Sequence, residues 1–170
     1  PNNIAICLSG DLDPDQTVDI IEEYFGKWER KDVPEFVANQ DIELSEAISK
    51  ETFGPQQELL YLGFKFDGAG SKEARMIQII DMLLANSQAG LIDIDLVLKQ
   101  KVLNASSFAQ ILKDHSIHFL YGIPKENQSL EEVKDLLLAE LQKIKQGDFD
   151  EWLLEAVVND LKISRIKSLE

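Results

Sequence analysis

The stretch Glu58–Phe66, which reads ELLYLGFKF, decides the fold. Leucine and phenylalanine occupy the even positions from 60 to 66, while Leu59, Tyr61 and Lys65 occupy odd positions. Side chains alternate between the two faces of a strand, so this pattern predicts a β-strand with two chemically different faces. Its high apolar content favours a central place in a sheet.

Two further strands are expected downstream. Gln100–Lys113 and Ser116–Ile123 are rich in β-branched and aromatic residues, and Asp114-His115 lies between them as a tight turn. This arrangement predicts an antiparallel hairpin, which Pro124 would end.

Three helices are expected around these strands, and each begins at a capping signal. The signals are Ser71, Ser129 with Glu132, and Asp148 with Glu151. Apolar residues recur at helical spacing after each signal, and Gly147 separates the last two helices. Leu91–Leu98 predicts a further helical turn or two.

The N-terminal part predicts a strand followed by a helix. Ile4–Leu8 is a short apolar run typical of a buried strand. Asp13 is a good N-cap before Pro14, and Gly26 is expected to end the helix. Ala47–Phe53 is expected to be an edge strand.

Strands that pair as hairpins, with helices between the groups, predict the α+β class: a mostly antiparallel β-sheet with helices packed on one face. Residues 1–170 are expected to form a single subdomain. Because the chain opens within a strand motif and closes inside an amphipathic helix, we expect it to have been cut from a larger multi-domain protein.

The composition excludes some classes of function. The chain has 17 basic and 31 acidic residues, a formal net charge of −14, which disfavours binding to nucleic acid. No apolar run reaches the roughly 18 residues that a membrane-spanning helix needs. The acidity keeps the chain soluble, or provides a surface that attracts basic peptides. The compartment stays open between the bacterial cytoplasm and the cell envelope or periplasm.

The residues themselves predict no catalytic centre and no metal site. The sequence contains no GxGxxG, P-loop, CxxC or GxSxG motif, and Cys7 is the single cysteine. His115 and His118 are three residues apart on an expected strand, which directs the two rings to opposite faces. A zinc site would require two more ligands, and no cluster supplies them.

Several stretches, in this order and spacing, resemble the second, non-metal-binding subdomain of M16 metallopeptidases. This is the family of pitrilysin, insulin-degrading enzyme and mitochondrial processing peptidase. The stretches are Asn3–Gly10 with Asp13-Pro14 and Tyr24–Gly26, Glu58–Phe66 with Ala74–Leu84, Leu91–Ser107, and Leu130–Ile144 joined to Phe149–Leu161 by Gly147–Glu151. The resemblance covers essentially the whole chain and implies the LuxS/MPP-like metallohydrolase fold.

The resemblance also implies where the chemistry lies. In this family an HxxEH helix in the first subdomain binds zinc, so no catalytic residue and no cofactor is expected in this chain. Zinc is expected in another subdomain of the parent. Leu98-Lys99 stands where the family has a substrate-contacting Leu-Arg pair, while the family's tyrosine position falls near Ala105 or Ser106. Lys99 and Lys101 are therefore the candidate substrate contacts.

The implied function is a non-catalytic structural or substrate-chamber subdomain of an M16-like zinc-dependent peptidase, with no activity alone. Its partners would be the other subdomains of the parent, a zinc metalloendopeptidase, and through them an unfolded peptide. The alternative is a scaffold or binding subunit on the same fold, in a parent without an active metal site. A third hypothesis is an unrelated α+β interaction domain, which would be favoured by a sheet that is not antiparallel or by helices on both faces of the sheet.

Overall fold

The computed structural model describes residues 2–35, 37 and 44–169, and the chain divides into two compact units. The first unit is Pro1–Thr52 and the second is Phe53–Glu170. The expectation of a single subdomain over residues 1–170 stays a prediction.

The first unit contains the expected helix. Helix α1 spans Pro14–Phe25, and the Asp13 side chain caps it by accepting a hydrogen bond from the Gln16 amide at 3.0 Å. Gly26 follows as the C-cap, and just beyond it the Trp28 ring packs edge-on against Phe25 with centroids 5.0 Å apart. The start and end signals read from the sequence are confirmed.

Two strands expected near the N-terminus are wrong. The structure assigns no strand to Ile4–Leu8 or to Ala47–Phe53, and the side chains of the first run are exposed, Cys7 included. A strand is held by hydrogen bonds to a neighbouring strand. The described residues of the first unit contain no other strand with which Ile4–Leu8 could pair.

The second unit is built on an antiparallel sheet whose described strands are three in number. They are β1 (Leu60–Asp67), β2 (Asn104–Ile111) and β3 (His115–Ile123), in the order β1-β3-β2. The expected antiparallel hairpin of β2 and β3 is confirmed, but its turn lies at 112–114 and not at Asp114-His115, because His115 already pairs within β3. The strand expected over Gln100–Lys113 is shorter and begins at Asn104. The central place expected for the first of these strands is wrong, because β3 pairs along its length with both neighbours and leaves β1 at an edge.

The helices of the second unit follow their capping signals closely. They are α2 (Lys72–Leu84), the π-helical segment η1 (Asp93–Leu98), α3 (Leu130–Gln146) and α4 (Glu151–Lys167). Ser71 caps α2, and a full capping box joins Ser129 to Glu132 at the start of α3. Gly147 ends α3 with a φ of +70°, which glycine adopts without strain. The cap expected at Asp148 is wrong: the N-cap residue of α4 is Asp150, two residues later, and its side chain makes no capping hydrogen bond.

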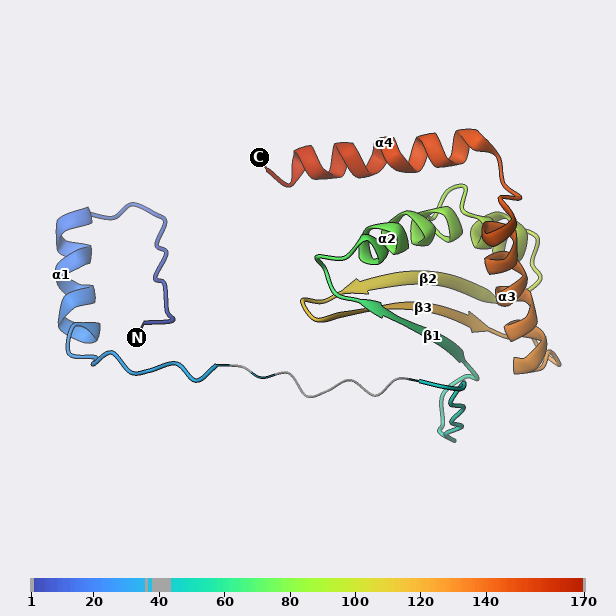
Figure 1. Cartoon of the computed structure of the whole chain (residues 1–170), viewed down its shortest axis with the longest axis horizontal. Coiled ribbons are helices and arrows are strands. Elements are labelled where there is room, and N and C mark those ends of the chain that lie inside the picture. The colour runs from blue at the N-terminus through green and yellow to red at the C-terminus, as the bar shows by residue number, and fades with distance from the viewer. Residues whose placement is uncertain (1, 36, 38–43, 170) are drawn as a thin grey trace. The chain divides into compact units, whose positions relative to one another are not determined.

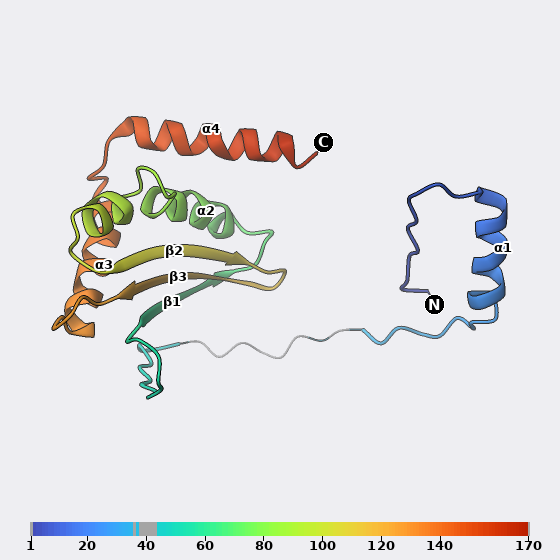
Figure 2. The ribbon, with the colours of Figure 1, turned by 180° about the vertical axis from the view of Figure 1, so that it is seen from behind.

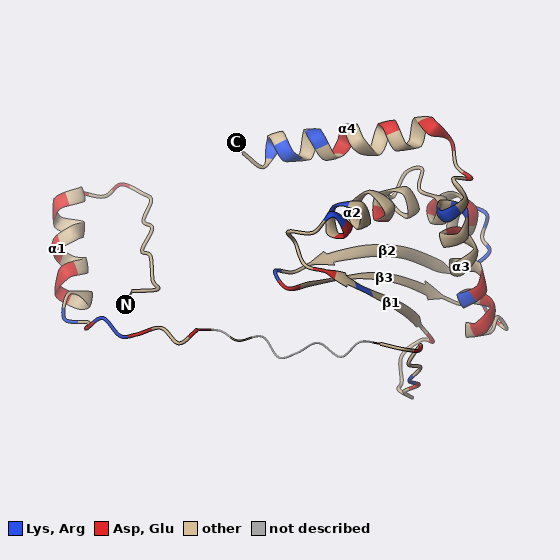
Figure 3. Ribbon diagram, in the orientation of Figure 1, with Lys and Arg blue, Asp and Glu red and all other residues tan. Residues whose placement is uncertain are grey.

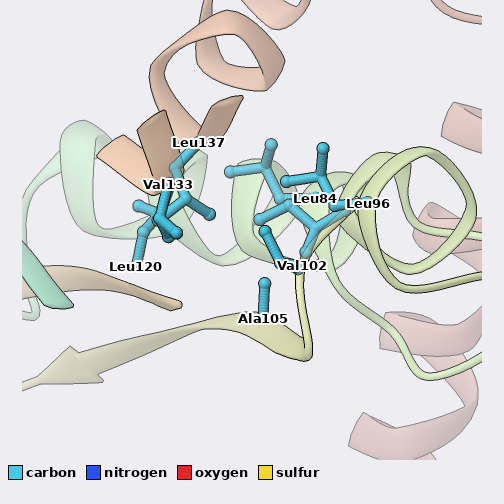
Figure 4. Close-up of a cluster of buried hydrophobic side chains, with 8 residues drawn as sticks. Leu84, Leu96, Val102, Ala105, Leu120, Val133 and Leu137 are labelled. Atoms are coloured by element: carbon cyan, nitrogen blue, oxygen red, sulfur yellow. The ribbon is translucent and has the colours of Figure 1, made fainter. Parts of the chain in front are cut away.

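Helices α2 and α3 lie on one face of the sheet, as the views from the two sides agree (Figures 1 and 2). Buried side chains between them and the strands form the main core, part of which Figure 4 shows: Leu84, Ile92, Leu96, Val102, Ala105, Leu120, Val133 and Leu137. Helix α4 packs on α2 through a second cluster of Leu83, Leu153 and Val157. The α+β class, with helices on one face of an antiparallel sheet, is confirmed. No helix in the described part of the chain is long and apolar enough to cross a membrane.

Candidate functional site

The two faces of the sheet in the second unit differ in what covers them. Even-numbered residues of β3 from Ser116 to Gly122 are buried beneath the helices, while odd-numbered residues are only half-buried. On this second face, called the open face below, Tyr61 and Phe108 are 56% and 42% exposed. The open face is therefore the large surface of this unit that its own helices leave accessible (Figure 2).

Aromatic side chains gather on the open face across all three strands. Phe108 of β2 stacks on Phe119 of β3 with ring centroids 4.9 Å apart, and Tyr61 of β1 lies 6.0 Å from Tyr121 of β3. These four residues are called the aromatic row below. They are cross-strand neighbours in the register of the sheet, and such pairs stabilise a sheet while presenting flat apolar surface.

Gly63 leaves a gap in this row. It lies opposite Phe119 in the register, and a Cβ placed there would lie 3.4 Å from Phe119 Cε1. A glycine inside a strand often marks a close approach by an aromatic ring, a ligand or another backbone. Here the Phe119 ring fills part of the gap.

Lys99 and Lys101, the two residues singled out from the sequence, lie where η1 leads into β2. Lys99 Nζ is 2.5 Å from Asp95 Oδ1, and its side chain is 57% exposed. The Lys101 amide donates to the Leu96 carbonyl at 2.8 Å. Between the two lysines Gln100 has a φ of +53°, an uncommon conformation for a residue other than glycine. π-Helical turns and residues held in this conformation are each frequent at functional sites.

An ion network fixes this joint to α3. Asp95 accepts from Lys99 through one carboxylate oxygen and from Lys143 through the other, and both distances are 2.5 Å. Lys143 also pairs with Glu140, at 2.8 Å to Oε2. Burial alone would raise the pKa of Asp95, but hydrogen bonds and charge from Lys143 and Lys99 outweigh it and lower the pKa. Burial alone would lower the pKa of Lys143, but hydrogen bonds and charge from Asp95 and Glu140 outweigh it and raise the pKa.

A shallow groove of about 780 Å³ lies beside the joint. It is lined by Gln57, Glu58, Leu103 and the connection 124–129 between β3 and α3. Gln128 from this lining donates through Nε2 to the Lys101 carbonyl at 2.9 Å. The groove is thus linked to the Lys101 backbone, although neither lysine contributes to its lining.

A buried polar cluster, centred on Asp81 of α2, was not predicted from the sequence. Asp81 Oδ1 accepts from Ser107 Oγ at 2.6 Å and lies 3.1 Å from His118 Nε2, while Oδ2 accepts from the Ala109 amide at 3.2 Å. The sequence does contain a signal for this cluster. Asp81 lies four residues after Ile77 and three before Leu84, which are both buried, so helical spacing places Asp81 on the same side of α2. The cluster ties α2 to β2 and β3.

The two histidines do not meet. His118 is 3% exposed and faces α2, whereas His115 lies on the other face of β3. Among the residues that the structure describes, no group of three or more His, Cys, Asp or Glu side chains is placed to hold a metal ion. In the Asp81 cluster Ser107 Oγ donates to the same carboxylate oxygen that His118 Nε2 contacts.

Comparisons with known proteins give one family match and a match in fold to a solved structure. The sequence profile of the family described as "Peptidase M16 inactive domain" matches residues 1–161. The comparison with curated proteins gives no match. A protease from Helicobacter pylori, known from a crystal structure, is similar in fold with a TM-score of 0.65 and 19% sequence identity. The similarity covers 94% of this chain and 40% of the protease chain.

Proposed function

Because the chain belongs to the M16 peptidase family, as its inactive domain, we propose that it is a non-catalytic wall domain of a zinc-dependent peptidase. In this role its open sheet face meets unfolded peptide, while a different domain of the parent binds zinc and cleaves the substrate. The observation that carries the proposal is the arrangement of α2 and α3, which cover one face of the sheet and leave the aromatic row on the other, where Tyr61 and Phe108 are exposed.

The aromatic row suits an extended polypeptide of variable sequence. Rigid aromatic rings contribute large contact area at a small cost in side-chain entropy, and they accept many kinds of side chain. The exposed Tyr61 ring at one strand and the exposed Phe108 ring at another give such a surface on both sides of β3.

Lys99 and Lys101 would add hydrogen-bond donors at the end of the sheet. Asp95 binds the Lys99 ammonium and is itself held by Lys143, while more than half of the Lys99 side chain stays in contact with solvent. Because the carboxylate of Asp95 compensates its charge, Lys99 is better suited to donate to peptide carbonyls than to attract an acidic substrate from a distance.

The second candidate is a scaffold domain in a parent without an active metal site. The ion pair from Lys99 to Asp95 favours it, because a lysine that is engaged by its own chain can be a purely structural residue. The two candidates differ in whether the open face binds peptide.

Binding of a fluorescein-labelled unfolded peptide to the full chain, followed by anisotropy, separates them. We expect the wild-type chain to bind, and Tyr61→Ser and Phe108→Ser each to weaken binding about five- to tenfold, as loss of an aromatic contact commonly does. Tyr24→Ser is the matched control, since Tyr24 is 69% exposed and lies in the first unit. Equal affinities for all four proteins would contradict a role for the open face, and absence of binding would favour the scaffold.

Hydrolysis of a quenched fluorescent peptide tests the non-catalytic part of the proposal. We expect no turnover by the full chain, with added zinc or with a chelator. Turnover that the chelator abolishes would mean that these residues form a metal site, and the proposal would be wrong.

A further inference from the structure

Helix α4 has apolar side chains on more than one side. Leu153 and Val157 are buried against α2, yet Ile163 and Ile166 are 48% and 61% exposed. A helix that packs against one neighbour normally has one apolar stripe and a polar remainder. The C-terminal half of α4 therefore has apolar surface beyond what its contact with α2 uses.

Part of this surface forms a groove between α4 and α2. The groove has a volume of about 550 Å³ and is lined by Ile79, Val158, Leu161, Lys162, Arg165 and Ile166. The lining is almost wholly apolar, so Lys162 and Arg165 contribute their aliphatic stems to it, as long basic side chains do when the charged group remains in water.

The charge beside the groove is opposite to that of the whole chain. The sequence 161–167 of α4 reads LKISRIK and contains three basic residues and no acid, in a chain of net charge −14. Figure 3 shows the basic residues of α4 at its C-terminal half and the acidic ones nearer its start. Basic residues in a last helical turn also compensate the helix dipole, but the dipole does not account for an apolar groove beside them.

We propose that this groove binds an amphipathic helix whose apolar stripe is flanked by acidic residues. A helix lies in a groove through apolar residues at positions i, i+3 or i+4, and i+7, and acidic residues beside them would meet Lys162 and Arg165. The proposal concerns a surface separate from the open sheet face and does not depend on peptide binding there. An anionic membrane is the less favoured occupant, because the apolar side chains line a shallow groove between two helices and a membrane presents a flat surface.

The test uses a labelled synthetic helix with leucine at the stripe positions and glutamate beside them, and a counterpart with lysine in place of glutamate. We expect the full chain to bind the acidic helix about tenfold more tightly than the basic one, with a difference that falls as salt is raised. The double variant Lys162→Glu/Arg165→Glu should weaken the acidic helix about tenfold and strengthen the basic one, since it replaces attraction by repulsion. Lys113→Glu/Lys145→Glu makes the same change of charge at exposed sites elsewhere and should alter neither affinity by more than about twofold.

A second pair of variants locates the site on the apolar lining. Ile166→Asn should weaken binding of the acidic helix, whereas Ile163→Asn, an exposed position of α4 outside the lining, should not. The proposal is overturned if the two helices bind equally, if neither binds, or if the charge reversals have no effect. Binding to vesicles of anionic lipid without binding to the acidic helix would also overturn it.

Discussion

The two faces of the same three strands have opposite chemistry. Leu120 and Phe119 are neighbours on β3, yet Leu120 is completely buried beneath α3 and α2, and Phe119 stacks on an exposed ring of the open face. Stability of the second unit should therefore depend mainly on the helix-covered face. Residues of the open face are less constrained by stability, so they can be suited to binding a partner.

The glycines of the sheet repeat this contrast. Gly122 lies on the helix-covered face, where a Cβ would overlap Val133 Cγ1 and lie 3.3 Å from Leu137 Cδ1. Gly63 lies on the open face, where a Cβ would meet only the edge of the Phe119 ring. The first glycine permits close helix packing, and the second only leaves room beside a ring.

Truncation of Leu120 gives the largest expected effect. Leu120→Ala should lower the free energy of unfolding by about 3 kcal/mol, because it removes buried methyl groups and leaves a cavity. Phe108→Ala on the open face should cost about 1 kcal/mol or less, because its ring is already partly hydrated. Urea unfolding followed by circular dichroism measures both, and equal losses would break the contrast between the faces.

Addition of a single methyl group should separate the faces again. Gly122→Ala should cost about 2 kcal/mol, since Val133 is β-branched and buried and has little freedom to move away. Gly63→Ala should change stability by no more than about 0.5 kcal/mol, because the strain against Phe119 is offset by the better strand propensity of alanine. The same urea titration decides, and a large loss for Gly63→Ala would show that the open face is as tightly packed as the covered one.

The polar cluster beneath α2 tests whether the covered face also depends on hydrogen bonds. Asp81→Ala should cost about 1.5 kcal/mol, because it leaves Ser107 Oγ and the Ala109 amide without their acceptor. Asp114→Ala, at an exposed turn position, is the control and should be nearly neutral. A neutral result for Asp81→Ala would mean that water replaces the carboxylate without loss.

Local signals in the sequence predicted most of the second unit, because caps, turns and periodicity act over a few residues. Ser71, Ser129 with Glu132, and Gly147 all mark helix ends in the structure. The place of each strand in the sheet depends instead on pairing between distant residues. For that reason the apolar content of Glu58–Phe66 suggested a central strand, although β1 lies at an edge. The strand predicted at Ile4–Leu8 was wrong for the same reason, because an apolar run does not show which other strand it would pair with.

The candidate site was predictable only in part. The sequence directed attention to Lys99 and Lys101, and their role as substrate contacts stays a prediction. The partners of Lys99 could not be foreseen, because Lys143 is far away in sequence and meets Asp95 only once α3 has packed beside η1. The aromatic row was equally hidden: Tyr61 and Phe108 lie on different strands and share a face only through the register with β3.

The smallest expected effect concerns the ion network of Asp95, Lys99 and Lys143, whose contribution to stability depends on pH. A carboxyl group whose pKa is lower in the folded than in the unfolded chain contributes stability that is complete above the unfolded value, about 3.9 for Asp. This contribution is lost as the pH falls through the lower, folded value. The pKa of Lys143 is raised, so its own contribution is complete below about 10.4 and is lost as the pH rises through the folded value.

Asp95→Asn should therefore cost about 1 kcal/mol at pH 7, a modest amount because Lys99 is largely exposed. The wild-type chain should lose stability more steeply than the variant as the pH falls below about 4, because only the wild type must protonate a carboxylate held by Lys143 and Lys99. Urea midpoints at a series of pH values measure the difference, with Asp114→Asn as a matched control at an exposed turn position. Parallel pH profiles for the wild type and Asp95→Asn would mean that the network is too well hydrated to hold the joint between η1 and β2. The stability of the covered face would then come from its apolar core and not from the ion network.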